Sequence, residues 1–394
     1  MSALHFEVAW VDRAADIPSP TWAQFFAPPL EGGWWYGALE QSGLNDQFKF
    51  RYLLLKEGGA IVGLVPTFLM DVPMRLVVPP GLLPWVTSLG RVLPWLRAQR
   101  TLFVGSPCAE EGWIGLSPAI DIPVALRCID AALRTEMRHQ GASVRVWKDF
   151  GAEWDSVLGS LAKASGMFRL VSFPGTAVAL PDTTREGYLQ SLGGNRRHRF
   201  KKKVRRSQEK VQLGVEVFRQ PDDPTLDKLF ALFWQTYEKA TTRFERLNRS
   251  FFGLIAAVPT TSFIVLREPA TSDPVAFMLC FEFPGRLVNK FIGIDYGRPR
   301  EWMLYFRLWD AAVDHAVSLG AKVLQSGQTG YRPKIDLGHH LVPLTNYCAH
   351  RNPLIHWVYA RVAAEVDWHT LDPSLGAALQ AHPELKQRTR SLEN

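Results

Sequence analysis

Apolar residues follow strand and helix spacings in the same order twice along this chain. In the first half, strands are predicted at 5–10, 51–56, 60–70, 101–105 and 143–148. Gly58-Gly59 predicts a tight turn between the second and third of these strands. Helical spacing at 122–140, which Gly141 ends, separates the last two strands. Helical material follows the first strand within residues 1–50, so the first half runs strand, helix, hairpin, long insertion, strand, helix, strand.

The second half repeats that order of elements. Strands are predicted at 176–180, 262–267, 275–283, 286–294 and 321–326, and helices at 226–241 and 305–319. Self-similarity of this kind indicates a repeated structural unit. We therefore expect two α/β domains of one type, at 1–170 and 171–355, followed by a helical tail at 356–394.

One apolar segment of the first half fits neither a regular helix nor a central strand. Residues 72–97 are apolar but contain five prolines, and two tryptophans, Trp85 and Trp95, stand within them. Three interpretations are open: a loop packed on its own domain, a lid over an apolar substrate, or a peripheral contact with a membrane surface.

Positive charge is concentrated in one segment of the second half. Residues 195–210, NRRHRFKKKVRRSQEK, hold nine arginines or lysines against one acid, Glu209, whereas the formal net charge of the whole chain is only +7. Helical spacing predicts an apolar stripe at Leu189, Leu192, Phe200 and Val204, and a basic stripe at Arg199, Lys203, Arg206 and Lys210. The segment is thus predicted to be an amphipathic helical insertion at 188–212, with a break at Gly193-Gly194 and an N-cap at Asn195.

The basic stripe places like charges four residues apart, which costs helix stability unless an anion offsets them. A nucleotide diphosphate, an RNA backbone and a lipid head-group are the candidate anions. The alternative is a solvated helix face whose charge is partly neutralised by acids elsewhere. The sequence leaves both interpretations open.

Several classes of chemistry find no support in the sequence. The four cysteines, at 108, 128, 280 and 348, lie far apart without metal-ligand spacing, and no metal site is expected. His339 and His340 are adjacent, which favours a loop or surface pair over two metal ligands on one helix face. The GQTG turn at 327–330 lacks the lysine and spacing of a phosphate loop, and no nucleophile elbow or dinucleotide fingerprint is present.

The same features bear on location. Free thiols are typical of a reducing compartment, no signal-peptide pattern stands at the N-terminus, and no stretch of about 18 apolar residues is found. We expect a cytoplasmic protein without a spanning segment.

Polar residues gather after two strands of the second half. Strand 286–294 is followed by Asp295, Tyr296, Arg298 and Arg300, and strand 321–326 ends in Ser326 and is followed by Gln328, Tyr331 and Lys334. Neighbouring strand ends of an α/β sheet commonly bind ligands. Acyl transfer requires a base, oxyanion donors and an acid for the leaving group. The candidates are Asp295 or Glu282 as base, Tyr331 as acid, and Lys334 for the oxyanion or a phosphate.

Three stretches carry a resemblance to a known family. They are the basic helix before a strand, YLQSLGGNRRHRFKKKVRRSQEKVQLGVEV, the aromatic helix LFWQTYEKATTR, and the turn GYRPKIDLG. Together they resemble the tandem-GNAT acyltransferases of the BioF-like or peptidoglycan-recognition group, relatives of the Fem-type aminoacyl transferases. The resemblance covers residues 176–347 well and the first half by element order only.

The resemblance implies two tandem GNAT-like domains, each with a mixed, mostly antiparallel sheet flanked by helices. It also implies an active cleft in the second repeat, at the turn that holds Tyr331, Lys334 and Gly338. Where ordinary GNAT acetyltransferases have a glycine-rich pyrophosphate loop, this chain has GRPREWMLYF at 297–306, with Arg298 and Arg300 as the available cations.

We therefore expect an acyltransferase that moves an acyl or aminoacyl group to an amine or hydroxyl of a small-molecule or peptide acceptor. Acyl-CoA, acyl carrier protein or aminoacyl-tRNA would be the co-substrate, without a metal. The cations expected to hold the carrier are Arg196, Arg197, Arg199, Lys203, Arg298 and Arg300. The rival hypothesis is a non-catalytic, degenerate GNAT pair that grips nucleic acid or an acidic partner through the basic helix.

Overall fold

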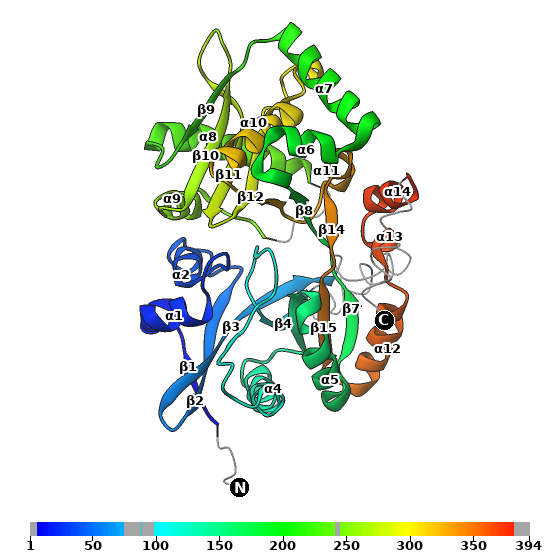
Figure 1. The fold of residues 1–394 in the computed structure, drawn as a ribbon. Coiled ribbons are helices and arrows are strands. Elements are labelled where there is room, and N and C mark those ends of the chain that lie inside the picture. The colour runs from blue at the N-terminus through cyan, green and yellow to red at the C-terminus, as the bar shows by residue number, and fades with distance from the viewer. Residues whose placement is uncertain (1–5, 75–87, 89–97, 241–244, 382–394) are drawn as a thin grey trace. The chain divides into compact units, whose positions relative to one another are not determined.

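The computed structural model describes residues 6–74, 88, 98–240 and 245–381. The chain divides into two compact units, one made of Met1–Phe173 and Pro343–Pro373 and the other of Pro174–Val342 and Ser374–Asn394 (Figure 1). Most of the apolar insertion predicted at 72–97 lies outside the described residues. Within the described part of the chain, no helix combines the length and the apolarity needed to cross a membrane.

The described part of the first unit contains an eight-stranded sheet with the order β1-β2-β3-β4-β6-β15-β7, in which β5 pairs with β3. All strand pairs are antiparallel except β4 with β6. The strands are β1 (Glu7–Val11), β2 (Lys49–Glu57), β3 (Ala60–Pro73), β4 (Ala98–Val104), β5 (Gly115–Leu116), β6 (Val144–Phe150), β7 (Phe168–Val171) and β15 (Thr345–His350).

Helices flank this sheet: α1 (Ser19–Phe25), α2 (Gly33–Gln41), α4 (Ile122–His139), α5 (Asp155–Ser165), α12 (Pro353–Ala364) and α13 (Trp368–Leu371). Helix α4 begins where the sequence predicts, because the Asp121 carboxylate accepts a hydrogen bond from the amide of Val124 at 3.0 Å. Its apolar face, which includes Leu126, Ile129 and Leu133, packs in the core of the unit.

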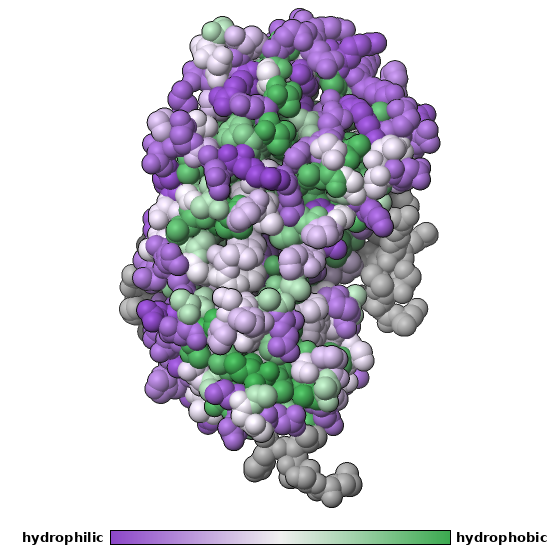
Figure 2. Space-filling view, turned by 60° about the vertical axis from the view of Figure 1, so that its left-hand side comes forward, coloured by the Kyte–Doolittle hydropathy of each residue, from purple (hydrophilic) through white to green (hydrophobic). Residues whose placement is uncertain are grey.

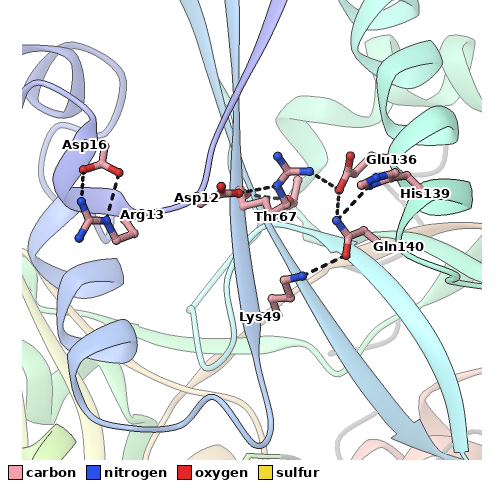
Figure 3. Close-up of polar contacts among 9 residues, drawn as sticks. Asp12, Arg13, Asp16, Lys49, Thr67, Glu136, His139 and Gln140 are labelled. Atoms are coloured by element: carbon pink, nitrogen blue, oxygen red, sulfur yellow. Dashed lines mark hydrogen bonds and ion pairs between the residues drawn. The ribbon is translucent and has the colours of Figure 1, made fainter.

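A polar network fixes the end of α4 to strand β2 (Figure 3). The Arg51 guanidinium donates to Asp12 at 2.8 Å and to Glu136 at 2.5 Å. The Gln140 amide donates to Glu136 at 2.6 Å and accepts from the Lys49 ammonium at 3.2 Å. Because Arg51 and Glu136 are largely shielded from water, salt screens this ion pair less than it would screen an exposed one.

The second unit contains a seven-stranded sheet with the order β14-β8-β13-β12-β11-β10-β9, again antiparallel apart from one pair, β12 with β13. The mixed, mostly antiparallel sheets expected from the sequence are thus confirmed. The strands are β8 (Gly175–Ala179), β9 (Gly214–Phe218), β10 (Thr261–Arg267), β11 (Pro274–Phe283), β12 (Arg286–Ile294), β13 (Val323–Ser326) and β14 (His340–Val342).

Helices cover both faces of the second sheet: α6 (Arg185–Ser191), α7 (Gly193–Lys210), α8 (Asp223–Lys239), α9 (Arg249–Ala256), α10 (Leu304–Ser318) and α11 (Tyr331–Asp336). Leu287 and Leu324 pack in one cluster with residues of α6, α7 and α10. Phe291 points to the opposite face, where its ring lies 5.4 Å from that of Phe252 on α9 and 5.8 Å from that of Phe233 on α8. The described chain ends with α14 (Pro373–Ala381).

The two sheets are built in the same way, with one strand of each contributed by a distant part of the chain. The order β1, β2, β3, β4, β6, β7 of the first unit matches β9, β10, β11, β12, β13, β14 of the second. In each sheet one strand is inserted between the last two: β15 between β6 and β7, and β8 between β13 and β14. Strand β8 follows the first repeat in sequence and β15 follows the second, so each repeat contributes its final strand to the other sheet.

Because of this exchange, the predicted strand and domain boundaries of the second half differ from the observed ones. The predicted strand at 176–180 is β8, which closes the first repeat's order, and the second repeat begins at β9. The predicted domain at 171–355 differs from the second unit for the same reason, because Pro343–Pro373 returns to the first unit.

The basic segment forms helix α7, with Phe200 and Val204 buried as the apolar stripe predicts. The helix begins at Gly193 rather than after Asn195. Gly193 has φ +68°, a conformation that glycine adopts without steric cost and that bends the chain between α6 and α7.

Candidate active site

Two parallel strands separate within the second sheet, and this separation creates the candidate site. Strands β12 and β13 pair over four residues, and the last pair is Asn289 with Ser326. Strand β12 continues for five residues to Ile294, paired with β11, after β13 has ended. A β-bulge whose extra residue is Lys290 lies at the point of separation. Bulges of this kind re-aim strands and side chains, and they are frequent beside active sites.

A row of three polar side chains crosses the sheet at this point. Thr176 of β8 lies opposite Ser326, and Ser326 lies opposite Asn289. All three are buried, and alternation places them on the face of the sheet that also carries Leu287 and Leu324. We call Thr176, Ser326 and Asn289 the polar row.

The polar row leaves one strong hydrogen-bond acceptor unused. The Asn289 amide nitrogen donates to the Ser326 hydroxyl at 3.2 Å, and the Thr176 hydroxyl donates to the Ser326 carbonyl. The Asn289 carbonyl oxygen is buried and has no hydrogen-bond partner among the described residues. A buried, unpaired amide oxygen costs about 1–3 kcal/mol, so its retention is explained if a ligand donates to it.

Helix α11 places Lys334 next to the polar row. The Lys334 ammonium donates to the carbonyl of Gly327, which also accepts from Thr176 at 3.3 Å. The Lys334 side chain is buried, although lysine almost never is without a specific reason. A buried ammonium interacts more strongly with a developing negative charge than an exposed one does, because water screens it less.

Tyr331 lies on the same short helix but has a different environment. It is fully buried, and its hydroxyl donates to the carbonyl of Pro174 at 3.0 Å. This bond joins α11 to the segment that precedes β8, and so fixes the helix that carries Lys334. The geometry therefore gives Tyr331 a positioning role.

Two further side chains near α11 have unpaired polar atoms. The amide nitrogen of Gln328, in the loop after β13, is buried and has no hydrogen-bond partner among the described residues. Both ring nitrogens of His339 are also buried without a hydrogen-bond partner among the described residues. Gln328 thus offers a hydrogen-bond donor and Asn289 an acceptor. A ligand that has one carbonyl oxygen and one N–H group, such as an amide, could pair with both.

His339 lies in the loop between α11 and β14, one of the two predicted places, but it is buried against Trp309 and not exposed at the surface. The rings of His339 and Trp309 lie 4.5 Å apart. Burial, together with the positive charges of Lys334 and His340, lowers the pKa of His339 well below its usual value. The imidazole is therefore neutral at physiological pH.

Asp295 and Arg298 belong to a different part of the unit from Lys334. Asp295 accepts from Arg298 at 2.8 Å and from the amide of Gly297 at 2.9 Å, and Arg298 also donates to Glu268 at 2.9 Å. Asp295 follows Asn289 by six residues of extended chain, which corresponds to about 20 Å. These contacts stabilise the turn after β12, and Arg300 lies exposed at the start of the short 3-10 helix Arg300–Trp302.

Glu282 is held in a separate cluster on β11. Its carboxylate contacts the His315 imidazole Nε2 at 2.8 Å and accepts from Arg219. Burial raises the pKa of Glu282, but hydrogen bonds from Ser262, His315 and Arg219 outweigh it, so the pKa is lowered overall. A carboxylate with a lowered pKa is a weak general base.

The cluster has the composition of a serine, histidine and acid triad but not its geometry. The Ser262 hydroxyl lies 3.5 Å from His315 Nε2, the same nitrogen that contacts Glu282. A triad needs the nucleophile and the acid on opposite ring nitrogens. The cluster is therefore a structural contact between β10, β11 and α10.

The predicted carrier-binding cations of α7 are Arg196, Arg197, Arg199 and Lys203, and two of them contact neighbouring helices. Arg199 forms an ion pair with Asp336 at 3.5 Å, and the Lys203 ammonium lies 3.8 Å from the centre of the Phe306 ring. Burial lowers the pKa of Lys203, and Asp336 only partly opposes this. Arg196 and Arg197 lie half-buried in the first turns of the helix. The remaining cations of α7 are exposed, and hydrophilic residues dominate the end of the unit where Figure 1 draws this helix (Figure 2).

The sequence predicted some of the residues of this candidate site. It placed Ser326, Gln328, Tyr331 and Lys334 together after a strand, and the structure brings them to one end of β13. It missed Thr176 and Asn289, whose signal is a lone polar residue on the buried face of an apolar strand. In the described residues, no group of three or more histidine, cysteine, aspartate or glutamate side chains could hold a metal ion.

The fold defines the class of protein. Two repeated units, each with a mixed sheet that opens between its two parallel strands, make this a tandem GNAT fold. No family model matches the chain, and no curated protein matches its sequence.

Solved structures resemble it. The crystal structure of FemX matches with a TM-score of 0.54 and 11% identity, covering 83% of this chain and 93% of FemX. A tandem GNAT protein from the clavulanic acid biosynthesis pathway matches with a TM-score of 0.51 and 12% identity, covering 89% of this chain and 99% of that protein. A conserved protein of unknown function from Bacteroides thetaiotaomicron matches with a TM-score of 0.51 and 11% identity, covering 87% and 99%. At these identities the likeness shows the fold, and it confirms the tandem GNAT-like architecture expected from the sequence.

Proposed function

We propose that this protein is an acyltransferase that moves an acyl or aminoacyl group from a phosphorylated carrier to an amine or hydroxyl acceptor. The observation that carries the proposal is the polar row beside Lys334, with an unpaired buried acceptor on Asn289 and an unpaired buried donor on Gln328. The fold shared with FemX and with a tandem GNAT protein supports the same class of reaction.

Each group at the site has a task in such a transfer. The acceptor nitrogen or hydroxyl would donate to the Asn289 carbonyl oxygen, which orients its lone pair toward the acyl carbon. The Lys334 ammonium and the Gln328 amide would stabilise the oxyanion that forms when the carbonyl is attacked. Tyr331 positions the helix that carries Lys334. The carrier departs with the proton that the acceptor loses, so the acyl group is transferred without net redox change.

The positive charge of helix α7 supports an anionic carrier of the acyl group. Helix α7 presents exposed cations along most of its length, with Glu209 paired to Arg205 at 3.6 Å as the one acid within the helix. Acyl-CoA, acyl carrier protein and aminoacyl-tRNA are all anionic. Arg199 and Lys203 lie on the side of α7 that faces α10 and α11, and are the cations best placed to hold a phosphate near the site.

A non-catalytic binding module is the second candidate. The exposed cations of α7 favour it by themselves, because they would bind a polyanion whether or not the site is active. The two candidates differ in what Lys334 does: an enzyme needs its buried charge, whereas a binding module does not.

The test compares Lys334→Met with the wild-type protein. Acetyl-CoA, acetylated acyl carrier protein and aminoacyl-tRNA are offered as donors with a panel of amines, and acylated products are measured by mass spectrometry. We expect kcat to fall about 10²- to 10³-fold with a smaller change in KM, as for loss of an oxyanion donor. Lys322→Met is the matched control, because Lys322 is exposed in the same unit. A wild-type protein that binds a donor but consumes none would favour the binding module.

A second experiment tests the carrier site. Lys201, Lys202 and Arg205 are exposed on α7, and Arg127, Arg138 and Lys163 are exposed on the first unit. Reversing the first three to glutamate should weaken carrier binding and reduce the slope of log affinity against log salt by up to about 3. Reversing the second three should leave that slope unchanged. Equal effects of the two triple variants would show that these three exposed cations of α7 do not contribute to carrier binding.

A further inference from the structure

His339 is a buried side chain of the second unit that has no task in the transfer reaction as described so far. It is 2% exposed, and neither ring nitrogen has a hydrogen-bond partner among the described residues. A neutral imidazole carries one N–H donor and one nitrogen that can accept a proton or a hydrogen bond. Burying both without partners costs free energy, which is explained if a ligand pairs with them.

Strand pairing places His339 on the same face of the sheet as the polar row. Strand β14 pairs with β8 so that Leu341 lies opposite Thr176. Two residues before Leu341, His339 falls opposite Val178, and alternation along β8 turns Val178 and Thr176 to one face. The contact of His339 with Trp309 agrees with this, because Trp309 and Val178 pack in one cluster. His339 thus lies two residues along the sheet from the polar row, which corresponds to about 7 Å.

The turn between α11 and β14 joins His339 to Lys334. The backbone amide of His339 donates to the carbonyl of Lys334 at 3.1 Å. The Lys334 ammonium is also close enough to the imidazole for its charge to lower the pKa of His339. Lys334 in turn shares the carbonyl of Gly327 with Thr176 of the polar row. A reacting carbonyl beside Lys334 would therefore lie near the imidazole as well.

The transfer reaction needs a group that accepts a proton. An amine or hydroxyl that attacks a carbonyl carbon must lose its proton in the process. Asp295 and Glu282, the bases expected from the sequence, are engaged by Arg298 and His315. His339 has an unprotonated ring nitrogen on the face that carries the polar row.

We propose that His339 is the general base of the transfer reaction and takes the acceptor's proton directly or through one water molecule. The acceptor nitrogen or oxygen forms its bond to the acyl carbon as its proton moves to the imidazole. The bond between the acyl carbon and the sulfur or oxygen of the carrier then breaks, and the imidazolium returns the proton to that leaving atom. This inference rests on the proposed function and adds to it the residue that moves the proton.

Lys334 couples the strength of this base to the progress of the reaction. In the resting protein, burial and the charges of Lys334 and His340 lower the pKa of His339, so the imidazole is neutral and able to accept a proton. An oxyanion that develops beside Lys334 supplies negative charge, which favours the imidazolium and raises the pKa of His339. Glu282 differs, because its permanent hydrogen-bond partners keep its pKa lowered.

Other titratable side chains on the neighbouring elements must be separated from His339. They are Lys334 and Asp336 of α11, His340 of β14, Tyr188 of α6, and Tyr305 and Asp310 of α10. Burial raises the pKa of Tyr188 and of Tyr305, so both stay neutral in acid. Burial also raises the pKa of Asp310, which forms an ion pair with Arg185. All of these groups remain when His339 alone is replaced, so that replacement isolates the imidazole.

Steady-state kinetics of His339→Gln tests the proposal. The donor and acceptor are the pair that gives the most product with the wild-type protein in the screen by mass spectrometry. Glutamine can form hydrogen bonds but does not take up the proton, so we expect kcat to fall about 100-fold with little change in KM. The matched control is His340→Gln at the half-buried neighbouring position, which alternation turns to the opposite face, and it should keep kcat near the wild-type value.

The pH dependence separates proton transfer from a structural role. The ratio of wild-type kcat to that of His339→Gln should decrease as acid protonates His339 below about pH 6.5. Titration of the acceptor cancels from this ratio, because both proteins use the same acceptor. When Lys334→Met is present in both proteins, the decrease should begin at higher pH, because the charge that opposes protonation of His339 is gone.

The outcomes distinguish this inference from the proposed function. Absence of transfer by the wild-type protein with every donor would overturn both. Transfer by the wild type with an equally active His339→Gln would overturn the assignment of His339 alone. So would a folded variant whose loss of kcat is the same at every pH, because His339 would then act through packing or hydrogen bonding. Circular dichroism shows whether the variant is folded, and His339→Asn takes its place if it is not.

Discussion

The two units open their sheets at equivalent positions but fill the openings with different chemistry. In the second unit, the last pair of the parallel strands is Asn289 with Ser326, and Thr176 extends the row. In the first unit, β4 and β6 also pair over four residues, and their last pair is Val104 with Trp147. Tyr347 of the exchanged strand β15 extends that row, as Thr176 of β8 does in the second unit.

The first opening is closed by apolar packing. Val104, Trp147 and Tyr347 are all fully buried members of the core of the first unit. In the second unit the corresponding side chains are small and polar. Among the described residues each row has one buried polar atom without a partner, the Trp147 indole nitrogen in the first unit and the Asn289 amide oxygen in the second. The same backbone architecture therefore holds large aromatic and aliphatic side chains in one repeat and the candidate site in the other.

Asn289→Val would make the second opening resemble the first, and we expect the largest effect. Transfer activity should fall about 100-fold, because the acceptor loses the oxygen that orients it. The free energy of unfolding should change by less than about 1 kcal/mol, because valine removes an unpaired buried oxygen together with one hydrogen bond. The measurements are kcat/KM and urea unfolding. Unchanged activity would show that the polar row is not part of the reaction.

Val104→Asn is the converse exchange in the first unit. It places an amide in an apolar core without partners and should reduce the free energy of unfolding by about 2 kcal/mol. Activity of the folded protein should not change. Urea denaturation measures the loss, with Val217→Asn on the exposed part of β9 as a control that should cost less than about 0.5 kcal/mol. A loss of activity without a loss of stability would indicate a role of the first unit in the reaction.

His339 allows a smaller test of the polar environment in the second unit. Its pKa is lowered by burial, so the unfolded chain binds a proton below about pH 6.5 that the folded protein does not. The unfolded state therefore gains protons as pH falls, and folding stability decreases. Between pH 7 and pH 5 this should cost about 1–2 kcal/mol.

His339→Gln should remove that part of the pH dependence, because glutamine does not titrate. The free energy of unfolding is measured from pH 5 to pH 7 for the wild type and the variant. His139→Gln, at an exposed position on α4, is the control and should preserve the slope. A slope that survives in His339→Gln would contradict the assignment of His339 as a buried neutral imidazole.

The local periodicities of the chain predicted most of the elements, because each depends on the spacing of apolar residues along one segment. The helix at 122–140, the hairpin at 51–70 and the strand at 286–294 lie where the patterns indicate. The amphipathic pattern of α7 also predicted its buried face. The start of α7 was placed three residues late, because a glycine with positive φ can begin a helix as well as break one.

The candidate site was only partly predictable for a related reason. Tyr331 and Lys334 belong to one short segment, and they were predicted because they follow the end of a strand. Asn289, Thr176 and His339 come from three separate segments. Asp295 and Glu282 were predicted as bases from their residue type, but in the structure they contact Arg298 and His315 instead. Choosing among several acids requires their distances, which the sequence does not contain.

By itself, the sequence determined the two repeats, their order of elements, the concentration of positive charge in α7 and the class of fold, because these follow from the spacing and composition of contiguous residues. Only the tertiary structure decided that the repeats exchange their final strands, which neighbours complete the polar row and which lysine is buried. Those properties depend on pairing between strands far apart in the chain. A pairing shift of one residue would turn Asn289 to the opposite face of the sheet.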